Sequence, residues 1–131
     1  MISLWNKQVI IEANVMQKHT GGCHCGAVRY EVEVDLSQTM ACNCSHCEKK
    51  GFILSFVPAE RFTLLSGEEM LTEYRFNKKA IAHLFCRACG VQSFGRGSDG
   101  SGKKTVAINV RCLDDIDLAS LHPKAFDGKN L

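Results

Sequence analysis

Cysteine constrains the fold of this chain more than any other residue type. Eight cysteines occur in 131 residues, and seven of them fall into three short motifs. The motifs are CHC at residues 23–25, CNCSHC at 42–47 and CRAC at 86–89. Cysteines clustered in this way form disulfides in an oxidising compartment or bind metal in a reducing one. Either kind of bonding would hold together segments that lie far apart in the sequence.

The N-terminal segment bears on the choice between disulfides and metal. Residues 1–15 read MISLWNKQVIIEANV, without the basic start, continuous apolar stretch and small residues of a signal peptide. No apolar run approaches the length of a membrane span. We therefore expect a cytoplasmic protein whose cysteines are reduced and bind metal. Residues 1–18 contain no chemical motif, and we treat them as an extension of uncertain role.

Length and charge indicate one globular domain, which we place at residues 19–131. A chain of 131 residues with 45% hydrophobic and 23% charged residues has the composition of such a domain. Its formal net charge is +2, and no run of five or six like charges occurs. The charge pattern therefore gives no support to a nucleic acid or a membrane as a partner.

Alternation of apolar and polar residues predicts a mainly β fold. In AVRYEVEV, residues 27–34, the apolar side chains of Val28, Tyr30, Val32 and Val34 share one face. Further short strands are predicted over residues 52–57, 61–65, 70–76, 80–85, 91–94 and 105–110. A loop rich in glycine and serine, residues 95–104, precedes the last of these. One short helix is expected near residues 117–121. Because the cysteine motifs fall between predicted strands, they should lie in turns.

Two of the motifs together offer the four thiolates of a closed structural zinc site. Cys23 and Cys25 would point to the same side of an extended chain. Gly90, directly after the CRAC motif, would let the backbone curl around a metal. We predict one structural zinc on Cys23, Cys25, Cys86 and Cys89. The alternative is that one of these pairs consists of buried thiols, which behave as small hydrophobic residues.

The remaining motif supplies three ligands, which is the number found in catalytic zinc sites with an open fourth position. We predict that Cys42, Cys44 and Cys47 hold this catalytic zinc, so that the chain binds two Zn²⁺ ions. Alternatively, a fourth protein ligand closes the site; the candidates are Cys112, His24, His46 and His83. The CxC motif could also pair with CxCxxC. An iron–sulfur cluster is a further alternative, although its C-x2-C-x2-C-x3-C spacing is absent.

The motifs resemble those of a known family. The stretches GGCHCGAVRYEV, CNCSHCEKKG, FCRACGVQSF, INVRCLDDID and FDGKN are similar to those of glutathione-dependent formaldehyde-activating enzymes. This carbon–sulfur lyase superfamily also includes centromere protein V. The resemblance covers residues 19–130 and implies the Mss4-like, or β-tent, zinc-binding fold of short coiled sheets. It also implies structural zinc on Cys23, Cys25, Cys86 and Cys89, and catalytic zinc on Cys42, Cys44 and Cys47.

The resemblance further implies a reaction that makes or breaks a carbon–sulfur bond. The founding reaction of the family condenses glutathione with formaldehyde to S-(hydroxymethyl)glutathione. Three thiolates give a zinc site a formal charge of −1, which favours a substrate sulfur over hydroxide in the open position. The expected partner is a small thiol or a thiol–aldehyde adduct, with glutathione among the candidates. The alternatives are a zinc-stabilised binding module without catalysis and a redox sensor.

A negative metal site needs hydrogen-bond donors or cations around it. Candidates within or near the cysteine motifs are Arg29, Lys49, Lys50 and Arg87. Three cations at the glycine-rich loop could instead meet the carboxylates of a glutathione-like ligand; these are Arg96, Lys103 and Lys104. Ordinary solvated surface charge is the alternative for each of them. His46 is the only side chain that the sequence suggests as a general acid or base.

Overall fold

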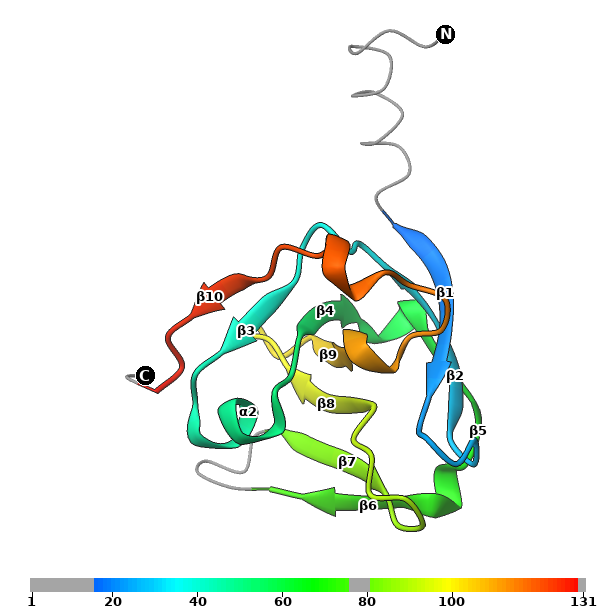
Figure 1. Ribbon diagram of the computed structural model, residues 1–131. Helices are drawn as coiled ribbons and strands as arrows, with labels where there is room; N and C mark the ends of the chain where they lie inside the picture. The colour runs from blue at the N-terminus through cyan, green and yellow to red at the C-terminus, as the bar shows by residue number, and fades with distance from the viewer. Residues whose placement is uncertain (1–15, 76–80, 130–131) are drawn as a thin grey trace, which may run out of the picture.

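The computed structural model describes residues 16–75 and 81–129, which form two β-sheets and one short α-helix (Figure 1). The strands are β1 (Gln17–Gly22), β2 (Arg29–Val34), β3 (Met40–Cys42), β4 (Leu54–Pro58), β5 (Phe62–Ser66), β6 (Leu71–Tyr74), β7 (Ala82–Cys86), β8 (Phe94–Ser98), β9 (Lys104–Asn109) and β10 (Lys124–Phe126). The helix is α2 (Ser45–Lys50), and the 3-10 turns are η1 (Ala59–Arg61), η2 (Glu68–Met70), η3 (Val110–Cys112) and η4 (Leu118–Ser120). The mainly β fold predicted from the sequence is confirmed.

The order of the strands brings distant motifs together. The smaller sheet has the order β1-β2-β5, and the larger one has the order β10-β3-β4-β9-β8-β7-β6. The described pairings are antiparallel, apart from the parallel pair β10 and β3. This parallel pair lays the C-terminal segment beside the CNCSHC motif. No helix in the described part of the chain is long and apolar enough to cross a membrane.

The structure shifts several predicted strands by a few residues. The prediction for residues 91–94 is wrong except at Phe94, because β8 begins there and the preceding residues form the end of a loop. The short helix expected near residues 117–121 is present as η4. Strand β1 begins at Gln17, two residues before the domain boundary that we placed at residue 19. Residues 76–80, which end one predicted strand and begin another, lie outside the described residues, as do residues 1–15 of the extension.

The main core lies between the two sheets. The predicted alternation in β2 holds, since Val28, Tyr30, Val32 and Val34 are at most 1% exposed. Their apolar face packs against Val57, Leu84, Phe94, Val106 and Ile108 of the larger sheet. The ring of Tyr30 lies 5.7 Å from that of Phe94, edge to face. Burial of this apolar surface is the main stabilising contribution of the fold.

The opposite face of the larger sheet carries a row of side chains with a hollow at its centre. In the strand register, Phe56 pairs with Ala107, Ala107 with Gly95, and Gly95 with His83. Side chains alternate along each strand, so this row faces away from core residues such as Val57. Two large side chains therefore flank a methyl group and a glycine. This difference in size leaves space above the middle of the sheet.

Candidate metal centres

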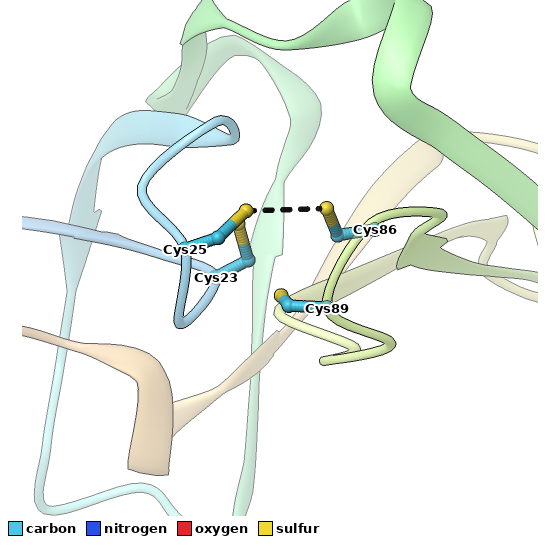
Figure 2. Close-up of side chains that lie close together, drawn as sticks. All are labelled: Cys23, Cys25, Cys86 and Cys89. Atoms are coloured by element: carbon cyan, nitrogen blue, oxygen red, sulfur yellow. Dashed lines mark hydrogen bonds between the residues drawn. The ribbon is translucent and has the colours of Figure 1, made fainter.

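The first candidate centre joins two turns that are distant in the sequence. Cys23 and Cys25 lie in the turn between β1 and β2, and Cys86 and Cys89 lie at the end of β7 and in the turn after it (Figure 2). Their sulfur atoms are 3.6 Å apart for Cys23 and Cys25, and 3.7 Å apart for Cys25 and Cys86. The four sulfur atoms all lie within 4.8 Å of one another. A tetrahedral zinc with Zn–S bonds of about 2.3 Å separates its sulfurs by about 3.8 Å, so this four-cysteine group fits the ion.

The local backbone explains how the sulfurs converge. The expectation of an extended CxC motif is wrong, because the N–H of Cys23 donates to the carbonyl oxygen of Val28 at 3.1 Å and closes a turn. Gly26 supports this turn with a φ of 84°. Gly90 has the predicted role, since its φ is 78° and its N–H donates to the carbonyl oxygen of Cys86 at 2.7 Å. Both turns therefore depend on a left-handed glycine.

Crowding shifts the pKa values of these thiols in opposite directions. Backbone N–H groups, chiefly that of Val91, lower the pKa of Cys89 to about 6. The backbone of Ala27 favours the thiolate of Cys25, but hydrogen bonds with Cys23 and Cys86 outweigh it and raise the pKa to about 11. The raised pKa of Cys25 favours its protonated thiol at neutral pH. A bound dication would stabilise all four thiolates at once.

The second candidate centre lies at the junction of β3 and α2. Cys42 ends the strand, Cys44 is the N-cap of the helix, and Cys47 lies in the first turn of the helix. The N–H of Cys44 donates to the sulfur of Cys42 at 3.4 Å, and the N–H of Cys47 donates to the sulfur of Cys44 at 3.3 Å. The three sulfur atoms lie within 4.8 Å of one another. This three-cysteine group can therefore hold a metal ion, and backbone donors already support its thiolates.

Within the described residues, no other histidine, cysteine or acidic side chain joins the three-cysteine group. Cys112 lies elsewhere, with its sulfur 3.8 Å from the carbonyl oxygen of Gln92, and burial raises the pKa of this thiol to about 11. His24 is exposed, and the rings of His46 and His83 lie 4.2 Å apart against each other. None of the proposed fourth ligands is therefore placed at this group. The CxC motif lies with CRAC and not with CxCxxC, the alternative that the spacing left open.

The C-terminal segment is attached to the three-cysteine group through Asn43. The N–H of Asn43 donates to the carbonyl oxygen of Phe126 at 3.1 Å. Its side-chain amide donates to a carboxylate oxygen of Asp127 at 2.9 Å, and its side-chain oxygen accepts from the N–H of Lys129 at 2.8 Å. One asparagine within the CNCSHC motif therefore holds residues 126–129 beside it.

Gly128 allows this segment to approach the metal ligands closely. A Cβ atom at this position would lie 2.5 Å from the sulfur of Cys42 and 3.4 Å from the Cβ of Cys44. No side chain fits at such a distance from a sulfur atom. The sequence pointed to FDGKN only through the family resemblance, because neither hydrophobic pattern nor spacing marks it as part of a metal site.

A cavity of about 380 Å³ opens beside the three-cysteine group. Its lining consists of Met40, Cys42, Cys44, Cys47, Phe52, Leu54, Phe56, Ile81, His83, Gln92, Phe94, Gly95, Ala107, Asn109, Phe126 and Gly128. The row of residues across β4, β9, β8 and β7 forms part of this lining. The cysteines therefore border a cavity that is open to solvent on one side and has the size of a small-molecule site.

The cavity also contains His83. The sequence suggested this residue only as a possible metal ligand, not as a proton donor. The side-chain nitrogen of Gln92 lies 3.3 Å from Nδ1 of His83. An amide nitrogen only donates, so Nδ1 accepts and the proton of the ring is on Nε2. Burial, with a smaller effect of His46, lowers the pKa of His83 to about 4, which keeps the ring neutral at pH 7. His46, the sequence candidate, lies against His83 with the two rings tilted by 44°, and it is not among the residues that line the cavity.

The cations suggested by the sequence have other positions. Arg29 forms an ion pair with Asp114, beside β1. Arg96 pairs with Glu68 at 3.6 Å, and Lys103 pairs with a further glutamate on η1. None of the seven cations lines the cavity; they are Arg29, Lys49, Lys50, Arg87, Arg96, Lys103 and Lys104. The structure therefore gives no support to carboxylate recognition by the glycine-rich loop.

Comparison with known proteins agrees with this geometry. The model of the family described as glutathione-dependent formaldehyde-activating enzyme matches residues 18–127. A crystal structure of a Rhodobacter sphaeroides protein, a structural genomics target, is similar with a TM-score of 0.72 and 30% sequence identity. The similarity covers 81% of this chain and 97% of the other. The region matched by the family includes both cysteine groups.

Proposed function

Because this chain belongs to the glutathione-dependent formaldehyde-activating enzyme family, we propose that it is a zinc-dependent carbon–sulfur lyase. Its reaction makes or breaks a thiol–aldehyde adduct of the S-(hydroxymethyl)glutathione type. The observation that carries this proposal is the three-cysteine group, which borders a cavity and has no fourth ligand among the described residues. A purely structural metal site would have no use for such a cavity.

The two cysteine groups have different roles in this proposal. The four-cysteine group holds a structural zinc, and Cys42, Cys44 and Cys47 hold a catalytic zinc. A zinc ion with three thiolate ligands would supply a soft Lewis acid for a substrate sulfur. The N–H groups of Cys44 and Cys47 hold two of the thiolates in place, and Gly128 leaves room for the sulfur of Cys42.

The reaction needs a place for one proton. When a thiol adds to an aldehyde, a carbon–sulfur bond forms, the carbon–oxygen double bond becomes single, and the thiol proton ends on the oxygen. The reverse reaction breaks the carbon–sulfur bond and returns the proton. We assign the handling of this proton to His83, a neutral ring in the cavity wall. Gln92 sets the tautomer.

The test is the exchange between a free thiol and its formaldehyde adduct, followed by NMR with the zinc-loaded protein. The proposal predicts exchange that is faster than the uncatalysed reaction and falls to the uncatalysed rate in Cys44→Ser. Metal analysis should give two zinc ions per chain for the protein purified without chelator. If the protein binds thiols but accelerates the exchange of none of them with a formaldehyde adduct, a non-catalytic zinc module is favoured instead.

We also propose a cytoplasmic location. All eight cysteines are free thiols in the structure, and a reducing compartment preserves them in this state. Localisation of the tagged protein by cell fractionation would test this directly.

A further inference from the structure

We propose that the cavity beside the three-cysteine group takes adducts whose thiol carries an uncharged apolar group, with an aromatic ring as the best fit. Charged glutathione would then be a poorer substrate. This inference rests on the proposed function and names the substrate class of that site. Its evidence lies in the lining, the depth and the rim of the cavity.

Most of the lining of the cavity beyond the cysteines is apolar. The apolar side chains are those of Met40, Phe52, Leu54, Phe56, Ile81, Ala107 and Phe126. Apart from the cysteines, the described lining residues carry no charge at neutral pH. The side chain of Asn109 is occupied, since it donates to the carbonyl oxygen of Gln92 at 2.9 Å and accepts from the N–H of Arg111 at 3.2 Å. Asn109 therefore offers little to a polar or charged ligand.

The hollow at the centre of the row from Phe56 to His83 gives the cavity its depth. Ala107 and Gly95 lie side by side at the middle of the row, between the two larger side chains. An engineered apolar cavity of about 150 Å³ accommodates benzene. The volume of about 380 Å³ found here has room for a ring together with the sulfur and the added aldehyde carbon.

The rim of the cavity exposes large apolar side chains to solvent. Six large hydrophobic residues are exposed in the described part of the chain, and three of them line this cavity. These three are Phe56, 48% exposed, Ile81, 44% exposed, and Phe126, 41% exposed. Exposed apolar side chains gathered at one place mark a binding surface. A ligand with an apolar group would bury them, and this burial contributes to its affinity.

Charge argues against glutathione at this site. Glutathione carries two carboxylates and one ammonium group, and a carboxylate that leaves water needs a cation or several donors. Of the three cations that the sequence suggested for this purpose, Arg96 and Lys103 are paired with Glu68 and Glu60, and Lys104, like them, does not line the cavity. An uncharged apolar thiol avoids this desolvation cost.

The test compares three thiols with formaldehyde as the common aldehyde, in the same NMR exchange assay. The thiols are phenylmethanethiol, its 4-carboxylate and glutathione. Because an unpaired carboxylate is costly to bury, we expect kcat/KM for phenylmethanethiol to exceed that for the 4-carboxylate and for glutathione by about tenfold or more. Calorimetry provides a readout that needs no turnover, and phenylmethanethiol should bind with the negative heat-capacity change of apolar burial.

Two variants test the position of the ligand. Ala107→Leu fills the hollow, so it should weaken binding of phenylmethanethiol by about tenfold or more and leave the zinc content unchanged. The matched control is Ala125→Leu, at an exposed strand position that does not line the cavity. Phe56→Ser at the rim should weaken binding about 3–5-fold. Its control is Leu65→Ser, equally exposed on β5.

The outcomes separate this inference from the proposed function. If glutathione is turned over and phenylmethanethiol is not, the substrate class is wrong and the lyase function stands. If no thiol is turned over, the function fails, and calorimetry with Ala107→Leu still decides whether the cavity binds an apolar thiol. A stable dimer that Phe56→Ser dissociates without weakening thiol binding would show that the rim serves a second copy of the chain, and it would overturn the inference.

Discussion

The two cysteine groups use the same ligand type in different surroundings. The four-cysteine group connects turns whose cysteines are at least 61 residues apart, the separation between Cys25 and Cys86. Cys23 and Cys86 are buried in the main core between the sheets. The three-cysteine group comes from one short stretch, and it belongs to a small separate cluster around Phe52 and Leu54. A metal at the first group would therefore hold the fold together, whereas a metal at the second would face a cavity.

Loss of a ligand from the four-cysteine group should have the largest effect. Structural zinc sites contribute apparent binding free energies of about 10–16 kcal/mol, and a domain of this size is stable by only about 5–15 kcal/mol. We expect Cys89→Ser to be unfolded or to lose cooperative unfolding, as measured by circular dichroism and NMR. The control is Cys112→Ser, which belongs to neither group and should remain folded. A folded Cys89→Ser protein with two zinc ions would show that this group is not structural.

Loss of a ligand from the three-cysteine group should abolish activity and preserve the fold. All three sulfurs come from one short segment, and the distant segment beside them, residues 126–129, is also held by hydrogen bonds to Asn43. We expect Cys44→Ser to keep the circular dichroism spectrum, to bind one zinc ion instead of two, and to accelerate no thiol exchange. If this variant unfolds while Cys89→Ser is tolerated, the roles of the two groups are inverted.

Gly128→Ala should disturb the three-cysteine group alone. The added methyl group would lie 2.5 Å from the sulfur of Cys42, so the ligand or the segment that contains Phe126 must move. Groups that support metal ligands typically change metal affinity about 10–100-fold when they are altered. Competition with a chelator should show this loss for one zinc ion of the two. Gly100→Ala, in an open loop with no atom within 4 Å, is the control. Equal zinc affinity in both variants would contradict the close approach.

Of these substitutions, Asp114→Asn should have the smallest effect on stability. It affects β1 and β2, whose connecting turn carries Cys23 and Cys25. Hydrogen bonds from Arg29 and Thr20 hold the pKa of Asp114 below its usual range and connect this carboxylate to β1 and β2. The Arg29–Asp114 pair is about one third exposed, so we expect a loss of only about 0.5–1 kcal/mol in the free energy of unfolding.

The lowered pKa of Asp114 determines how the difference in free energy of unfolding between wild type and Asp114→Asn depends on pH. A carboxyl group whose pKa is lower in the folded state stabilises the fold fully above its ordinary pKa of about 4, and the contribution is lost as the pH falls through the folded value. Urea unfolding of wild type and Asp114→Asn should therefore give a constant difference between pH 8 and pH 6. A difference that shrinks within this range would contradict the assignment.

The sequence predicted those features that depend on local pattern. The alternation in β2 indicated its buried face. The division of the seven cysteines expected from ligand numbers is the one in which the structure groups them, although spacing alone left another pairing open. Gly90 was expected at the turn where the structure has a φ of 78°. These features depend on residues that are close in the sequence, or on ligand numbers set by metal chemistry.

Features that depend on strand register could not be predicted. The row from Phe56 to His83 is formed by four strands, and nothing within each strand shows which residues will lie opposite one another. Strand β10 pairs in parallel with β3 over three exposed residues, so it lacks a hydrophobic signal. The cavity, the role of Gly128 and the placement of His83 all follow from these pairings.

The central claim is that the three-cysteine group keeps an exchangeable fourth position while the four-cysteine group is closed. Cobalt in place of zinc reports this through absorption that depends on its ligands. Addition of a small thiol should change the spectrum of one cobalt in the wild type and in Cys112→Ser, and it should change nothing in Cys44→Ser, which keeps only the four-cysteine site. The account would be contradicted if both cobalt ions gave the absorption of a four-sulfur site that does not change when thiol is added. A change on addition of thiol that persists in Cys44→Ser would also contradict it.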